Sequence, residues 1–187
     1  MSDINLNRRS TLKALGAGLL TAGSFSGSAT AHKGGLKGEL AEVRSATAKY
    51  NDPANAYADG FMAFGESGPI PLEDVVSEAE SICGMGFHFA NFDNFGTYDR
   101  LKPQVLVYGV DDDGDLILGA VEYIIPDEIT GGNPDLFTHD DGEEHWDAGP
   151  FPGVHSLHVW VHTHNPDGVF NHTNPRKQFS PDGCLNH

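Results

Sequence analysis

The stretch PQVLVYGVDDDGDLILGAVEYII, residues 103–125, decides the fold. Two apolar, β-branched runs flank the turn DDDG, and an Asp-Gly step between such runs is typical of a β-hairpin. A calcium-binding loop is the competing interpretation of the three aspartates. The glycine follows directly after the third aspartate and no acid stands at the twelfth position, so the spacing of such a loop is wrong. We therefore predict an antiparallel hairpin.

Two further strands are expected on either side of this hairpin. In GMGFHFAN, residues 84–91, side-chain alternation places Met85, Phe87 and Phe89 on one face and His88 on the other. A second strand is expected over residues 156–163, within SLHVWVHTHNP, after a long polar loop at 126–155. Alternation divides this segment into an apolar face and a polar face, with Leu157, Val159 and Val161 on the first and His158, Trp160, His162 and His164 on the second.

Helices are expected before the strands. The residues Leu36, Leu40, Val43, Thr47 and Tyr50 recur at steps of three and four and form one helical stripe, with Glu39, Glu42 and Arg44 off it. Asp52 and Pro53 predict the start of a second, short helix that ends at Gly60, and a third is expected within 72–80. The sequence thus predicts an α+β fold, with amino-terminal helices packed on a small antiparallel β-sheet of about four strands.

The first 31 residues read as an export signal of the twin-arginine type. NRRSTLK, residues 7–13, precedes a weakly apolar run, and the segment ends in ATA at 29–31. A membrane anchor is the alternative, but the run is too short and too rich in Gly and Ser to span ~30 Å of hydrocarbon. We expect residues 1–31 to be removed and residues 32–187 to form a single α+β domain, exported by the twin-arginine machinery and secreted or held in the cell envelope.

The chain is strongly acidic, with a net charge of −16. Removal of residues 1–31 takes away three bases and one acid, which leaves −18. Such a surface repels nucleic acid and anionic membranes. The paucity of lysine and the excess of acid are typical of proteins from salt-loving archaea, because salt screens the self-repulsion.

A metal site is the sharpest chemical prediction. His88, Glu122 and His158 each place one polar group on the apolar or small-residue face of a predicted strand. A buried carboxylate is costly unless it is paired or bound to a cation. If the three faces coincide, the residues supply N, O and N ligands that suit zinc, copper or iron. His162 and His164 are weaker candidates from the same segment.

Several alternatives remain open at this level. The strand histidines can be hydrogen-bonded structural residues, and Glu122 can lie on a solvent-facing edge or pair with Arg100 or Lys102. The protein would then be a ligand-binding or envelope-associated module with a buried polar network. A copper brace at His32 and solvated roles for His139 and His145 are also open. No catalytic residue is identified, because no nucleophile elbow surrounds Ser156.

The two cysteines, Cys83 and Cys184, allow one pairing. An exported chain meets an oxidising compartment, which favours a disulfide over a role as metal ligands. The sequence NHT at Asn171 also matches a glycosylation sequon, which by itself is a weak signal.

Four motifs in order, GMGFH at 84–88, KPQVLVY at 102–108, VEY at 121–123 and LHVWVHTHNP at 157–166, resemble a functionally uncharacterised family of small exported prokaryotic proteins. The resemblance covers residues ~36–184 and includes the helix ATAKYNDPANAYADGF that precedes the motifs. It implies this order of segments and equivalents of His88, Glu122, His158 and both cysteines, but no activity. The chain departs from the pattern at His162, where the family is typically aromatic, and His164 is variable there.

Overall fold

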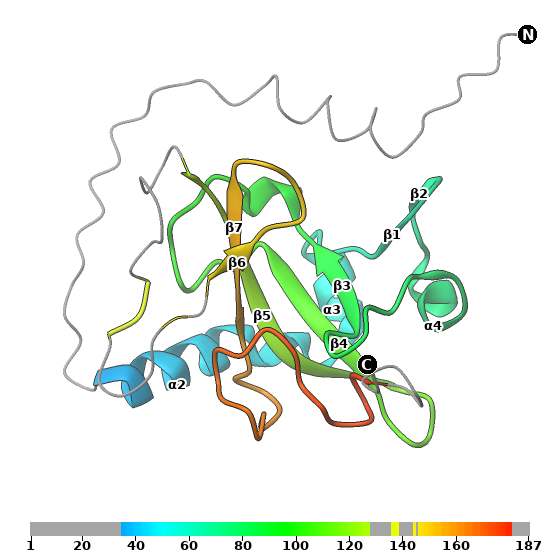
Figure 1. Ribbon diagram of the computed structural model, residues 1–187. Helices are drawn as coiled ribbons and strands as arrows, with labels where there is room; N and C mark the ends of the chain where they lie inside the picture. The colour runs from blue at the N-terminus through cyan, green and yellow to red at the C-terminus, as the bar shows by residue number, and fades with distance from the viewer. Residues whose placement is uncertain (1–34, 128–135, 139–143, 145, 181–187) are drawn as a thin grey trace, which may run out of the picture.

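A computed structural model describes residues 35–127, 136–138, 144 and 146–180. It has an α+β fold, as predicted, in which few and short helices accompany two antiparallel sheets (Figure 1). The helical elements are α2 (Gly35–Thr47), η1 (Ala48–Asn51), α3 (Pro53–Ala58), η2 (Leu72–Asp74), α4 (Val75–Glu78) and η3 (Phe92–Asn94). The strands are β1 (Phe64–Gly65), β2 (Gly68–Pro69), β3 (Phe87–Ala90), β4 (Val105–Val110), β5 (Leu116–Pro126), β6 (Asp147–Ala148) and β7 (Val154–Val159).

The main sheet has five antiparallel strands in the order β3-β4-β5-β7-β6, and β1 and β2 pair separately. The predicted hairpin is confirmed as β4–β5. Its turn is closed by Asp111, whose Oδ1 accepts hydrogen bonds of 2.9 Å from the amides of both Asp113 and Asp115. Turn chemistry therefore accounts for the aspartate run without a cation.

The carboxyl-terminal strand differs from its prediction. Strand β7 begins at Val154 and ends at Val159, whereas residues 156–163 were expected, and β6 lies within the segment expected to be a loop. The chain leaves the sheet at Trp160, whose amide donates to the Val169 carbonyl at 2.9 Å. Side-chain alternation therefore stops before His162.

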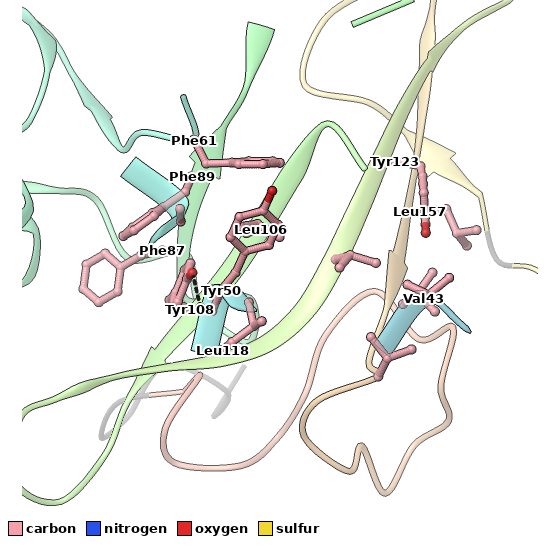
Figure 2. Packing of buried hydrophobic residues seen from close by; sticks show 14 of the residues in the cluster. Val43, Tyr50, Phe61, Phe87, Phe89, Leu106, Tyr108, Leu118, Tyr123 and Leu157 are labelled. Atoms are coloured by element: carbon pink, nitrogen blue, oxygen red, sulfur yellow. Dashed lines mark hydrogen bonds between the residues drawn. The ribbon is translucent and has the colours of Figure 1, made fainter. Parts of the chain in front are cut away.

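The two faces of the sheet have different contents. On one face, aromatic and aliphatic side chains pack beneath α2, η1 and α3 and form the main core (Figure 2); its members include Val43, Tyr50, Phe61, Phe87, Phe89, Leu106, Tyr108, Tyr123 and Leu157. The hydroxyl of Tyr108 donates to the Tyr50 carbonyl at 2.6 Å and ties the sheet to η1. The other face carries a smaller cluster of Val107, Ala120, Trp160 and Phe179. His88, Glu122 and His158 lie on this second face.

Three of the predictions for the helices can be scored. The helix expected within 72–80 is present as η2 and α4. Asp52 caps α3 as expected, since its Oδ1 accepts from the Ala54 amide at 3.0 Å. The placement of Glu39 off the buried stripe is wrong, because Glu39 is buried. Its carboxylate accepts hydrogen bonds from the amide and hydroxyl of Thr138 and lies 3.6 Å from Arg100. Thr138 and Arg100 thus provide partners for the Glu39 carboxylate, which the spacing of apolar residues along the helix had placed on the solvent-exposed side.

Several predictions fall outside the described residues. The export signal at 1–31, His32, His139, His145 and Cys184 all lie there. Within the described ranges, no helix is both long and apolar enough to cross a membrane.

Candidate metal centre

Three neighbouring strand pairs bring the predicted ligands to one place. Glu122 on β5 lies directly opposite His158 on β7, and on its other side it lies opposite Val105 on β4. His88 on β3 lies opposite Val107 of β4. Directly opposed residues share a face of an antiparallel sheet, so all three polar side chains rise from the same face. Among the described residues, His88, Glu122 and His158 form the group able to hold a metal ion.

The three ligand atoms form a nearly regular triangle. His88 Nε2 is 3.4 Å from His158 Nε2 and 3.7 Å from Glu122 Oε2, and His158 Nε2 is 3.9 Å from Glu122 Oε2. The centre of the circle through these atoms lies about 2.1 Å from each of them, and zinc binds imidazole nitrogen and carboxylate oxygen at ~2.0–2.2 Å. The existing positions thus match metal–ligand bond lengths.

The site is buried and its polar atoms are unsatisfied. His158 and Glu122 are 1% and 4% exposed, while the side chain of His88 is 21% exposed. Within the part of the chain that the structure describes, Glu122 Oε2 and the Nδ1 atoms of His88 and His158 have no hydrogen-bond partner. Buried polar atoms without partners are rare, and a bound water or ion is one way in which proteins satisfy them.

Burial also sets the protonation states of these groups. It raises the pKa of Glu122 to about 8, and a hydrogen bond with Ser156 offsets part of this effect. It lowers the pKa of His88 to about 4 and that of His158 well below its ordinary value. At neutral pH the imidazoles are therefore neutral and offer lone pairs, as metal ligation requires. Burial disfavours the charged form of Glu122, so either protonation or a neighbouring cation would stabilise this side chain.

The structure does not bring the weaker candidates to this group. His162 lies beyond the end of β7, and its Nε2 is 2.8 Å from Thr47 Oγ1 on α2. His164 is exposed. Both line a cavity of 510 Å³ that also includes Arg44 and Trp160. Trp160 and Val161 still follow the alternation, since Trp160 packs on the second face and Val161 in the main core, but His162, three residues after the end of β7 at Val159, does not.

Neither alternative partner proposed for Glu122 pairs with it: Lys102 is exposed, and Arg100 is engaged elsewhere. Arg100 Nη2 is 2.8 Å from Glu42 Oε2, and Arg100 Nη1 is 3.6 Å from Glu39 Oε1. Glu122 is also buried, so it does not lie on a solvent-facing edge as the other alternative assumed.

Sequence reasoning missed His172 and Asp147, which lie beside the group. The rings of His172 and His158 are in edge-to-face contact, with centroids 4.9 Å apart. His172 Nδ1 is 2.9 Å from Asp147 Oδ2. His172 belongs to an irregular segment, so no strand or helix periodicity could have assigned it to this face. The only signal was the local density of histidines.

The disulfide between Cys83 and Cys184 stays a prediction, because Cys184 lies outside the described residues. The Gly84 amide, next to Cys83, donates to the Phe179 carbonyl at 2.9 Å. The chain therefore passes close to Cys83 five residues before Cys184, which favours the pairing.

Comparison of the chain with family models, with curated proteins and with solved structures gave no match.

Proposed function

We propose that this protein binds one transition metal ion through His88 Nε2, Glu122 Oε2 and His158 Nε2. The observation that carries the proposal is the triangle of ligand atoms, whose centre lies about 2.1 Å from each atom. The unsatisfied Glu122 Oε2 supports it, because a cation would supply the partner that this oxygen lacks among the described residues.

The donor set narrows the metal to zinc, copper or iron. Two imidazoles and one carboxylate suit these ions, whereas calcium and magnesium prefer sites made of oxygen ligands. Three protein ligands leave at least one position for a further ligand. No catalytic residue is assigned, so the proposed function is metal binding and not a particular reaction.

Metal analysis of protein purified without added metal tests this proposal. Wild-type protein should carry about one equivalent of zinc, copper or iron, or take it up on addition, while His88→Ala and His158→Ala should not. His155→Ala is the matched control. It lies on the same strand as His158 but points to the opposite face, and its Nδ1 already has a carboxylate partner in Asp127 at 2.5 Å. Metal-free wild type with no thermal shift from any of these ions would overturn the proposal.

A second candidate function is a non-metal ligand-binding or envelope-associated module. The observation in its favour is the 3.4 Å contact between His88 Nε2 and His158 Nε2, which is within hydrogen-bond distance. In this alternative the three residues form a buried polar network that specifies the core. Glu122→Gln separates the two candidates, because an amide can keep a hydrogen-bonded network but is a poor ligand for these metals.

We further propose that the protein is exported through the twin-arginine machinery and acts outside the cytoplasm as a soluble protein in high salt. The arginine pair at Arg8 and Arg9 and the net charge of −16 support this proposal. Because this route carries folded proteins, a metal could be bound before export. Replacement of both arginines by lysine should retain the uncleaved chain in the cytoplasm, whereas unchanged secretion would contradict this route.

A further inference from the structure

We propose that His172, oriented by Asp147, is the fourth protein ligand of the metal centre. The inference rests on the proposed function and specifies the complete ligand set of that site. His172 lies outside the group of three, so it joins by a side-chain movement once an ion is present.

Strand β6 places Asp147 on the correct face. Asp147 lies opposite Ser156 of β7, and Ser156 is two residues from His158 along the same strand. Residues two apart in a strand share a face, so Asp147, Ser156 and His158 rise from one side of the sheet. The loop that carries His172 packs over this side, since Trp160 Nε1 donates to the Asn171 carbonyl at 2.7 Å.

Asp147 lies within reach of the His172 ring. Asp147 Oδ2 is 2.9 Å from His172 Nδ1, but the contact lacks hydrogen-bond geometry, and His172 Nδ1 has no hydrogen-bond partner among the described residues. A turn of the ring that forms this hydrogen bond would hold the proton on Nδ1 and leave the Nε2 lone pair for a metal. A carboxylate at the second nitrogen is the usual arrangement around metal-bound histidine, where it fixes both tautomer and ring orientation. The Nδ1 atoms of His88 and His158 have neither a hydrogen-bond partner nor, in any ion pair between described residues, a carboxylate as close as Asp147 is to His172.

His172 is close to His158. Its ring lies 4.9 Å from that of His158 at an interplanar angle of 80°. The side chain of His172 is 38% exposed, so it has room to turn. Strands hold the three ligands His88, Glu122 and His158 in place. His172 would supply a fourth, movable ligand from the solvent-exposed side of the site.

The chemical consequence is a closed site. Three histidines and one glutamate complete a four-coordinate shell, which is typical of metal sites without a free position for substrate. Displacement of His172 would open that position. His172 therefore determines whether the centre exposes the ion to an external ligand.

Cobalt(II) provides the test, since its visible absorption reports coordination number and its affinity can be measured by competition with a chelator. We compare wild type, His172→Ala, His172→Gln and Asp147→Asn with the control variants His155→Ala and Asp127→Asn. The controls break an equivalent His–Asp pair on the opposite sheet face. Circular dichroism and thermal melting verify that each variant is folded.

The expected result is that Asp147→Asn still binds one cobalt but about 10–100-fold more weakly. His172→Ala should weaken cobalt binding by a larger factor, with a changed spectrum, and the control variants should match wild type. Wild-type affinity and spectrum in the folded His172 variants would overturn this inference and leave the three-residue site intact. Absence of any binding to wild type would instead overturn the proposed function, and the inference with it.

Discussion

Glu122 on β5 and His158 on β7 are directly opposed in the sheet, and Glu122 Oε2 lies 3.9 Å from His158 Nε2. Both side chains are buried, and Glu122 Oε2 accepts no hydrogen bond from any described residue. A carboxylate in this position destabilises the metal-free fold, and it is the group most favoured by an added cation. Glu122 should therefore lower the stability of the metal-free protein and raise its affinity for a metal ion.

Replacement of Glu122 by glutamine should stabilise the metal-free protein at alkaline pH. Burial raises the pKa of Glu122 from 4.5 to about 8. A raised carboxyl pKa contributes stability that is fully present below pH 4.5 and is lost as the pH rises through 8. Glutamine removes this loss, so its free energy of unfolding at pH 8–9 should exceed that of wild type by roughly 2–5 kcal/mol. Denaturant unfolding at several pH values measures the difference.

Glu39→Gln is the control for this experiment, since Glu39 is equally buried but has Thr138 and Arg100 as partners. Its loss should lower stability by roughly 1–3 kcal/mol, because a charged hydrogen-bond acceptor is removed from donors that need it. If Glu122→Gln also destabilises the metal-free protein at pH 8–9, Glu122 is not the costly, unpaired buried carboxylate that this account requires.

Gly119→Ala should destabilise the second face of the sheet. A Cβ at Gly119 would overlap the ring of Phe179 and lie 3.1 Å from Trp160 Cζ3. Overpacking of a filled core costs about 1–3 kcal/mol. Thermal or denaturant melting should show this loss, whereas Gly38→Ala on α2, whose Cβ would meet nothing within 4 Å, should be neutral or stabilising. Unchanged stability of Gly119→Ala would mean that Phe179 does not pack where the structure places it.

Thiol counting tests the predicted disulfide. Under denaturing, non-reducing conditions the chain should have no free thiol. The disulfide closes a loop of ~100 residues, and its loss in Cys83→Ser should lower stability by about 4–5 kcal/mol in the chain-entropy estimate. Two free thiols in the wild-type protein would refute the pairing.

The sequence predicted those parts of the fold that have a regular period. Alternation placed Phe87 and Phe89 on one face, which the structure buries in the core, and His88 on the other, and the DDDG turn located the hairpin. Both depend on local backbone geometry, which short motifs specify well.

Features that depend on distant contacts could not be predicted. Glu39 is buried because Thr138 and Arg100, far along the chain, satisfy its charge. His162 leaves the face of His158 because β7 ends at Val159, and His172 reaches that face from an irregular segment. Prediction from sequence periodicity assumes that a strand continues as long as the pattern does, and His162 breaks this assumption. It also assumes that side chains in loops point to solvent, and His172 breaks this one.

Calorimetric titration of metal-free wild-type protein with zinc, beside His158→Ala, tests the central claim most directly. The account predicts one bound ion per wild-type chain and no specific binding to His158→Ala, with His155→Ala equal to wild type. Absence of binding to the wild-type chain, or equal binding by wild type and a folded His158→Ala, would contradict a metal centre at His88, Glu122 and His158.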